Sequence, residues 1–467
     1  MPQPNILAYV MLAVWPLVTW QLWRRMDTGR ALVWTILGGY LVLPPLAALD
    51  LPAVPDLNKV TIPNLAAFAF AVFVLKDRIS FLPASVTGKG LMVLFVLSPF
   101  ATVLTNTHPV HVAGGPLPGT SLYDSFASVA NQGIVLLPYF MARRYLAGPE
   151  APRAALAALV AAGLAYSLPM LVEARLSPQI NVWVYGFFQH DFFQTIRFGG
   201  YRPVVFLPHG LWVAFFAFMA AMAALLPVRE RPGTERPKHL MIALYLLAMI
   251  IVCKSAGAAI YALASAPLIL FAPARIQILV AGGLAGIVIL YPMLRGLHLV
   301  PVDWVVSVAR SFDADRAYSL AFRINNEELL LAHAAEKPLF GWGGYGRNLL
   351  HDPVSGKVET IADGAWIIVL GIYGWLGYLA EFGLLVLPLL LLAREVLGRG
   401  ARRVTLATAT LALILAMNLA DLIPNATEIP FTWLMAGAVL GQAERLRATR
   451  KHEERAPRSV LVHRTVI

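Results

Sequence analysis

The stretch VVFLPHGLWVAFFAFMAAMAALLP, residues 204–227, decides the fold class. It runs for 24 residues without an aspartate, glutamate, lysine or arginine. A helix of that length rises about 36 Å, which is enough to cross the roughly 30 Å hydrocarbon core of a bilayer. The stretch therefore predicts a helix that spans a membrane.

Similar apolar runs recur along the whole chain. Together they predict an all-α fold, a polytopic transmembrane helix bundle of about 12–14 spans. The count stays open because only Lys254, Ser255 and Gly257 interrupt the run from 239 to 272. The expected spans are 6–22, 31–49, 61–75, 90–106, 122–142, 152–172, 204–227, 239–253, 256–272, 276–293, 366–393, 404–420 and 428–443.

Proline and N-terminal features refine this map. Pro44 and Pro45 in the second expected span, and Pro169 near the end of the sixth, are expected to kink their helices. The first apolar run, Ile6–Trp23, is followed rather than preceded by basic residues. A cleaved signal peptide has the opposite polarity, so we expect this run to be a retained span.

The composition agrees with a membrane protein. Of the 467 residues 58% are hydrophobic and 13% charged, whereas about a quarter of a soluble domain is charged. The formal net charge is +11, but the basic residues lie in short stretches between apolar runs and in the C-terminal tail. This pattern is typical of cytoplasmic loops, so we expect contact with membrane lipids and no nucleic-acid partner.

The loops rich in arginine and lysine all fall on one side of the span map, together with the tail. The positive-inside rule assigns that side to the cytoplasm and leaves the N-terminus outside. We expect one polytopic domain, 1–443, and a basic cytoplasmic tail, 444–467. Cys253 is the only cysteine, which excludes a disulfide within the chain and a cysteine-based metal site. No metal or cofactor is expected.

Two long external regions, 173–203 and 294–365, are expected to form the active-site region. In the first, Arg197 and Arg202 flank a Gly-Gly turn beside Tyr201, and His209 follows at the mouth of the next span. Aromatic residues at an interface are often only anchors. A charge such as Arg202, where the chain re-enters the bilayer, is costly unless it pairs with an anion.

The second region contains an expected amphipathic helix, DADRAYSLAFRINNEELLLAHAAEKP, residues 313–338. Arg316 and Arg323 lie seven residues apart and share a face, and Glu327 lies one turn beyond Arg323. These residues either form an ordinary surface helix with an ion pair or bind a ligand. Asp313 or Asp315 is expected to cap the helix, and its expected apolar stripe comprises Leu320, Ile324, Leu331 and Ala335.

A glycine-rich turn, PLFGWGGYGRNLL at 338–350, follows the helix and contains Trp342 and Arg347. It lacks the spacing and lysine of nucleotide-binding loops. Glycine-rich backbone can let N–H groups approach an anion closely. Asp363 stands just before the next span, which contains Glu381.

Taken together, these motifs resemble the O-antigen ligase and polymerase superfamily of bacterial envelopes. The resemblance covers roughly residues 190–385 and rests on YRPVVFLPHGL (201–211), an arginine on an amphipathic helix, PLFGWGGYG (338–346) and a polar residue before a span that contains EFG (381–383). It implies a metal-independent glycosyltransferase on the external, periplasmic face of the bacterial inner membrane. The implied donor is a glycan on undecaprenyl pyrophosphate.

The resemblance also implies partners and residue roles. The acceptor would be another lipid-linked glycan or lipid A core, and a flippase and a chain-length regulator would be further partners. Arg202 and Arg323 would grip the pyrophosphate. Asp363 stands where ligases of the superfamily usually carry a histidine, which favours a polymerase, with Asp363 as general base or acceptor ligand. His209, His333 and His351 are alternative substitutes for that histidine.

Three other interpretations stay open. A ligase differs from a polymerase only in its acceptor. A transporter or flippase for lipid-linked sugars predicts ionisable residues deep inside spans, where Glu381 is the main candidate. A structural membrane scaffold would account for the spans but not for the external arginines.

Overall fold

The computed structural model describes residues 3–51, 54–197, 199–231, 233–312, 314–398 and 404–455, and no side chain is described at 312, 315, 316 or 455. The described chain is helical, with α1 to α16 and three short two-stranded hairpins. The predicted all-α fold is confirmed.

A helix occupies each of the thirteen expected spans. Six of them, α1, α4, α6, α8, α11 and α14, are long and apolar enough to cross a membrane, and the total number of crossings stays a prediction. The bounds are α1 Ile6–Arg25, α2 Thr28–Val42, α3 Thr61–Ala69 with a π-helical continuation to Val74, α4 Val86–Leu104, α5 Leu122–Tyr145, α6 Ala151–Leu176, α8 Gly210–Glu230, α9 Arg236–Val252, α10 Ala256–Phe271, α11 Ala274–Gly296, α14 Ala365–Leu397, α15 Leu406–Asp421 and α16 Pro430–Arg455.

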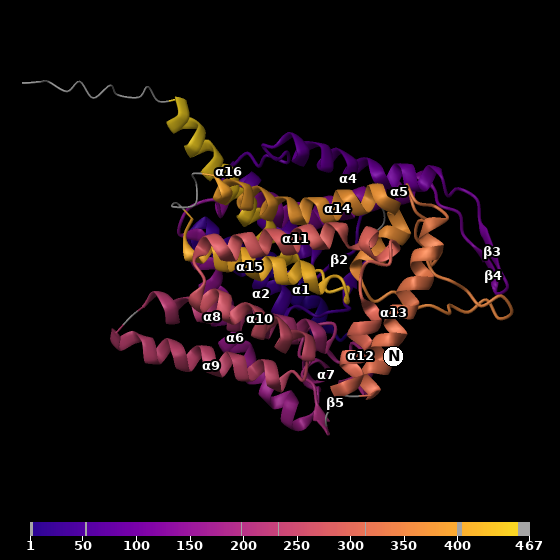
Figure 1. Cartoon of the computed structure of the whole chain (residues 1–467), viewed down its shortest axis with the longest axis horizontal. Helices are drawn as coiled ribbons and strands as arrows, with labels where there is room; N and C mark the ends of the chain where they lie inside the picture. The colour runs from indigo at the N-terminus through magenta and orange to yellow at the C-terminus, as the bar shows by residue number, and fades with distance from the viewer. Residues whose placement is uncertain are drawn as a thin grey trace, which may run out of the picture.

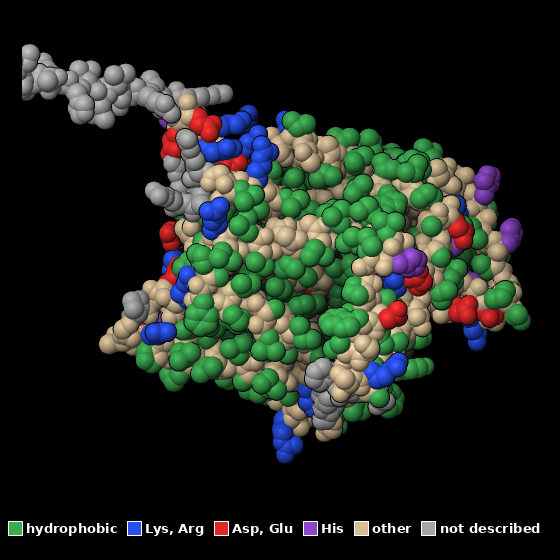
Figure 2. Space-filling view, in the orientation of Figure 1, with side chains coloured by type: hydrophobic (Ala, Val, Ile, Leu, Met, Phe, Trp, Pro, Cys, Tyr) green, Lys and Arg blue, Asp and Glu red, His purple; other side chains and the backbone are tan. Residues whose placement is uncertain are grey.

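The remaining α-helices and hairpins gather at one end of the bundle, which we call the α13 end (Figure 1). There α13 runs across the ends of the long helices rather than along them. Figure 2 shows hydrophobic side chains over the middle of the molecule and charged side chains mainly towards its two ends. These elements are α7 Ile180–Tyr185, α12 Val302–Phe312, α13 Ala314–Ala335, β3–β4 Val110–Val112 and Gly115–Leu117, and β5–β6 Ile196–Arg197 and Gly200–Tyr201; the β1–β2 hairpin is Ala48–Leu49 and Leu57–Asn58.

Helix α8 forms the centre of the bundle and packs against α6, α9, α10 and α15. It is the most buried of the six long apolar helices. Its run of alanines permits close approach, since a Cβ at Gly163 of α6 would lie 2.5 Å from the Cβ of Ala220. Small residues at such crossings allow helices to pack closely inside a membrane, where apolar burial alone drives little association.

The expected span 204–227 is wrong at its start, because α8 begins at Gly210. Pro208 disfavours helical backbone at Leu207, and side chains from other elements take up the hydrogen-bonding groups of 204–207 instead. Likewise, Pro44 and Pro45 do not kink α2. The helix ends before them, at Val42.

The expected amphipathic helix is confirmed as α13, but its packed face differs from the expected stripe. Leu330 and Ala334 are buried, whereas Ala335 is exposed. The expected caps, Asp313 and the side chain of Asp315, lie outside the described residues.

The glycine-rich turn inserts into a break in α14 at Gly374, whose φ is 65°. The N–H groups of Trp342 and Gly343 donate to the carbonyls of Gly371 and Ile372 at 2.8 and 2.9 Å, and Trp375 N–H donates to Pro338 at 2.8 Å. These N–H groups are satisfied by backbone carbonyls. The expectation that the turn offers its N–H groups to an anion is therefore wrong for Trp342 and Gly343.

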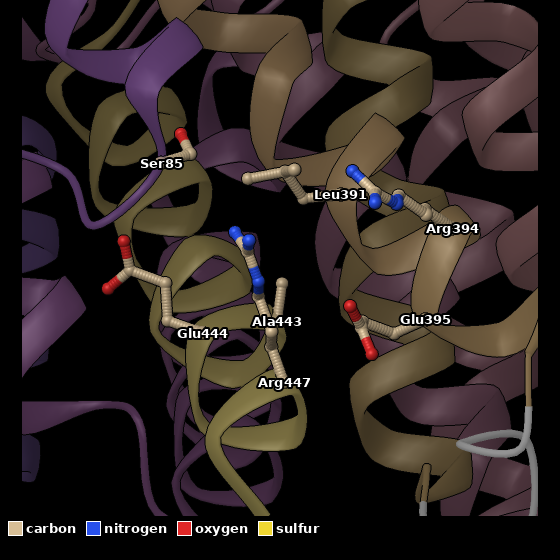
Figure 3. Close-up of a pocket in the computed structure, with 7 residues that line it drawn as sticks. All are labelled: Ser85, Leu391, Arg394, Glu395, Ala443, Glu444 and Arg447. Atoms are coloured by element: carbon tan, nitrogen blue, oxygen red, sulfur yellow. The ribbon is translucent and has the colours of Figure 1, made fainter. Parts of the chain in front are cut away.

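At the opposite end, the first part of the expected tail continues α16 as helix to Arg455. Its Glu444 accepts from Arg143 Nε at 2.7 Å and from Ala84 N–H at 2.7 Å. Arg447 lies between Glu444 and Glu395 in a small pocket of about 10 Å³ (Figure 3). These contacts fix the start of the tail to the bundle, and residues 456–467 lie outside the described part of the chain.

Candidate functional site

The segment from Pro203 to Pro208 is a non-helical loop buried inside the bundle at the α13 end. Val204, Val205 and Leu207 are each 0% exposed. Buried backbone groups must find partners, and here side chains supply them. Glu173 Oε2 accepts from Val204 and Val205 N–H at 2.7 Å each, and the Tyr166 hydroxyl accepts from Phe206 N–H at 3.1 Å.

The carbonyls of the same loop are satisfied in the same way. Gln189 Nε2 donates to Val205 and Leu207 at 2.8 and 3.0 Å, and Lys59 Nζ donates to Phe206 at 2.7 Å. We call Glu173, Tyr166, Gln189 and Lys59 the loop clamp. It holds Val205 at φ 53°, a conformation that a β-branched residue rarely adopts and that needs support from its surroundings.

The clamped loop places Arg202 at its start and His209 at its end. The Arg202 side chain is 5% exposed overall and lies over Gly210, the first residue of α8, where a Cβ would be 2.6 Å from Arg202 Cδ. Glycine is needed there because any larger residue would displace the arginine. The guanidinium thus lies at the N-terminal end of α8, which favours negative charge.

Arg202 has an unusual electrostatic environment. Among the described residues it forms no ion pair, and its Nε has no hydrogen-bond partner. Burial, followed by the neighbouring charges of Arg197 and Arg323, lowers the pKa of Arg202 to about 10. We call Arg197, Arg202 and Arg323 the cationic cluster. A buried guanidinium beside like charges is unfavourable unless an anion binds there.

His209 caps α8, and its Nδ1 accepts from Leu211 N–H at 3.1 Å. Burial, followed by the neighbouring His190 and the cationic cluster, lowers the pKa of His209 to about 3. The imidazole is therefore neutral near pH 7, with its proton on Nε2, and can donate one hydrogen bond without adding charge.

Arg323 comes to the cluster from α13 and contacts two other segments. Its Nε lies 3.4 Å from Asp363 Oδ2, and its Nη1 donates to Asn425 Oδ1 at 3.5 Å. The structure thus brings Arg323 into contact with Asp363 and close enough to Arg202 for the two charges to interact, although the three residues come from distant parts of the sequence. The Asp363 carboxylate is about one third exposed, at 30% of its side chain, so a ligand can reach it.

Within the described ranges Glu327 does not form the ion pair with Arg323 that the surface-helix alternative would show. It is 7% exposed, and burial raises its pKa to about 7 despite the nearby charge of Arg295. Arg295 itself pairs with Glu328 at 2.8 Å. Glu327 therefore lies beneath the cluster rather than on its surface.

Arg347 and Trp342 bind other parts of the protein. Arg347 is 3% exposed and donates through Nη1 to the carbonyls of Asn106 and Pro118 at 2.8 and 3.2 Å. Trp342 stacks on His333 with ring centroids 4.3 Å apart and donates to the His333 carbonyl at 2.8 Å. These contacts favour a structural role for both residues, joining the turn to α13 and to the segment after α4.

The other expected site residues vary in position. The Arg197 side chain is exposed at the tip of β5–β6, where Lys254 Nζ binds its carbonyl at 2.8 Å. Tyr201 packs against Phe192, and His351 forms a bridge with Val358 away from this cluster. The side chain of Arg316 lies outside the described residues.

Sequence reasoning missed the loop clamp and Asn425. Glu173 was visible only as a carboxylate at the end of an apolar run, and nothing local pairs it with residues 31 positions later. His190, whose ring centroid lies 4.4 Å from that of His209, was also missed. Within the described ranges, no group of three or more His, Cys, Asp or Glu side chains is placed to hold a metal ion.

The arrangement can bind an anion and handle a proton beside it. Two guanidiniums and a helix N-terminus provide positive potential, and the Asp363 carboxylate next to Arg323 can accept a proton from a bound hydroxyl. In the comparisons with known proteins, no protein-family model matches the chain and no curated protein matches it.

Proposed function

We propose that the chain is a glycosyltransferase of the bacterial inner membrane that polymerises surface polysaccharide or exopolysaccharide. Its donor is a glycan on undecaprenyl pyrophosphate, and the reaction takes place at the external, α13 end. The observation that carries the proposal is Arg202, which is buried without an anionic partner inside the cationic cluster. The resemblance of residues 190–385 to the ligase and polymerase superfamily supports the same assignment.

The proposed roles follow from the chemistry of the groups. Arg202 and Arg323 bind the pyrophosphate, because a guanidinium fork fits phosphate oxygens in a bidentate manner. The acceptor hydroxyl oxygen bonds to the anomeric carbon of the donor sugar, and the bond from that carbon to the pyrophosphate oxygen breaks. The electron pair leaves with the pyrophosphate, whose negative charge the arginines stabilise. Asp363 accepts the proton of the hydroxyl.

A polymerase is preferred to a ligase because Asp363, rather than histidine, stands beside Arg323. The contact with Arg323 holds the carboxylate in one position beside the cluster, as a general base requires. Undecaprenyl-pyrophosphate-linked repeat units then serve as both donor and acceptor, supplied by a flippase. A chain-length regulator is a further expected partner.

The test uses purified protein in detergent and lipid-linked repeat units from the producing bacterium, without nucleotide or metal. Products are separated on a gel beside those of an Arg202→Ala, Arg323→Ala double variant. We expect a ladder of longer lipid-linked glycans that the double variant does not form.

Other outcomes would contradict the polymerase. If no ladder forms but glycan is transferred once lipid A core is added, the chain is a ligase. If purified protein in vesicles moves lipid-linked glycan across the bilayer and forms no new glycosidic bond, it is a transporter, and Glu381 becomes its first candidate residue. Equal ladders from wild type and double variant would remove the arginines from the mechanism.

A further inference from the structure

A second cavity, of about 280 Å³, lies among α3, α5 and α16. Its polar lining includes Asn58, Asn131 and Glu428, and Val135 and Pro430 are among its apolar walls. Its volume is just below the range of about 300–1,000 Å³ for small-molecule sites. It therefore suits a ligand about the size of a single sugar ring.

The position of the cavity along the bundle follows from which residues of α5 and α16 lie opposite each other. A Cβ at Gly437 would lie 2.1 Å from the Tyr139 carbonyl oxygen, and one at Gly441 would lie 2.5 Å from that of Arg143. The residue numbers in contact rise in step, from 139 to 143 on α5 and from 437 to 441 on α16, so the two helices run parallel. Counting back eight residues on each helix places Asn131 level with the start of α16. Helix α5 begins nine residues earlier, at Leu122, so it extends about 13 Å beyond the cavity. Tyr345 of the glycine-rich turn donates to Asp124 near the start of α5, so the cavity lies in the part of the bundle nearer the α13 end, about 13 Å inward from the start of α5.

The hydrogen-bonding groups of the cavity suit hydroxyls rather than charge. Among the described residues, the Asn131 amide makes no hydrogen bond. Asn58 uses Oδ1 to bind Val60 and Thr61 N–H at 2.8 and 3.2 Å, which leaves its NH₂ to donate. Glu428 accepts a hydrogen bond from the indole of Trp433 and shares another with the Glu381 carboxyl, and its carboxyl group lines the cavity. Amide and carboxyl groups together bind neighbouring hydroxyls as both donors and acceptors.

The cavity shares its walls with the candidate site. Asn58 precedes Lys59, whose Nζ binds the Phe206 carbonyl in the loop between Arg202 and His209. Glu428 comes three residues after Asn425, which accepts a hydrogen bond from Arg323. Three residues of chain span at most about 11 Å. A ligand in the cavity is thus held by the same segments that shape the cationic cluster.

We propose that this cavity binds the terminal sugar of the acceptor glycan and directs its hydroxyl towards the cationic cluster. The inference rests on the proposed function and adds the acceptor subsite to it. The cluster takes the anionic end of the donor, and the uncharged, hydroxyl-rich end of the acceptor occupies the cavity.

The first experiment measures binding through protection from labelling rather than through product formation. Asn131→Cys and Ala130→Cys variants of the full chain are labelled with a polar maleimide, since native Cys253 is 0% exposed. Ala130 is exposed on the same helix and does not line the cavity. Two probes are added separately: undecaprenyl pyrophosphate carrying a repeat unit, and undecaprenyl pyrophosphate without glycan.

We expect only the glycan-bearing lipid to protect Asn131→Cys. At about ten times its Kd it should slow labelling about tenfold, while Ala130→Cys reacts at an unchanged rate. Equal labelling with and without the glycan-bearing lipid would overturn the proposal. So would equal protection by the glycan-free lipid, because the cavity would then bind the lipid carrier.

The second experiment fills the cavity. Asn131→Trp should abolish elongation of lipid-linked repeat units, and Ala130→Trp, with the same bulk outside the cavity, should retain it. If Asn131→Trp elongates as well as Ala130→Trp, the subsite is wrong even though the polymerase stands. If the wild-type protein forms no ladder at all, the proposed function fails first, and the acceptor role fails with it.

Discussion

Asp363 is the side chain on which the proposed chemistry depends most closely. Its carboxylate lies 3.4 Å from Arg323 Nε and is accessible to a ligand. We expect Asp363→Asn to lower the rate of glycan transfer by about 10²–10⁴, the usual contribution of a general base, while donor binding is retained. The measurement is the initial rate of ladder formation.

The matched control for this variant is Asp303→Asn, an exposed carboxylate of α12 at the same end of the molecule. It should leave the rate unchanged. Full activity of Asp363→Asn would assign the base to another residue, and His209 would be tested next.

Glu327 gives a prediction about stability rather than activity. Burial raises its pKa from 4.5 to about 7, so between these pH values the folded protein holds a proton that the unfolded chain has released. Stability therefore falls as pH rises across this window and levels off above it. Glu327→Gln should remove this loss, which amounts to about 3 kcal/mol at most.

The measurement is the melting temperature of both proteins in detergent from pH 4 to pH 8. The melting temperature of the variant should rise relative to that of wild type between about pH 4.5 and about pH 7, and the difference should persist at higher pH. Glu336→Gln, at an exposed position just after α13, corrects for the loss of one carboxylate. A difference that does not change with pH would contradict the assigned environment of Glu327.

Among the structural elements, the glycine-rich turn has a mechanical role in the break of α14. Gly341 has φ 68°, and a Cβ there would lie 2.4 Å from the Ile372 carbonyl oxygen. We expect Gly341→Ala to destabilise the fold by about 2 kcal/mol or more, because it combines a disfavoured conformation with a backbone clash. Thermal unfolding measures the change.

Gly344→Ala is the control for Gly341→Ala, since nothing lies within 4 Å of a Cβ at that position. It should melt close to wild type. Similar melting temperatures for the two variants would mean that the turn does not depend on its insertion into α14.

The loop clamp makes a second prediction about an element. Glu173 holds three backbone N–H groups, those of Ile180, Val204 and Val205. Glu173→Ala should leave them unpaired in a buried site, at a cost of about 1–3 kcal/mol for each group that finds no water. Transfer should fall as well, because the clamped loop positions Arg202.

Glu173→Gln keeps one acceptor oxygen and should recover part of both losses. Arg175→Ala, an exposed change two residues away on α6, should have little effect on either. Wild-type melting and transfer in Glu173→Ala would show that the loop needs no clamp.

At the scale of elements, the sequence predicts helices well and their ends less well. Apolar runs marked each of the six long apolar helices, since the bilayer requires about the same length of each. The segment 204–209 was expected to be helical because it is apolar, and its real partners, such as Glu173 and Lys59, come from elsewhere in the chain. The insertion of the turn at 338–346 into α14 depends on tertiary contacts that no local pattern contains.

For the whole molecule, the sequence placed charged residues in two separate external regions, and the structure joins them. Arg202 and Arg323 are 121 positions apart in sequence, and their charges interact at the α13 end. Arg347 was expected to join them but binds backbone carbonyls near Asn106 instead. The residue types of the candidate site could be predicted, whereas the choice among several arginines required the fold.

The central claim is that the cationic cluster binds the pyrophosphate of a lipid-linked glycan. The most direct measurement is native mass spectrometry of the purified protein with undecaprenyl pyrophosphate, alongside undecaprenol, which lacks the phosphates. We predict that wild type retains undecaprenyl pyrophosphate in preference to undecaprenol, and that Arg202→Ala, Arg323→Ala loses this preference while still melting as a folded protein. Equal retention of the two lipids by wild type, or an unchanged preference in the folded double variant, would contradict the account.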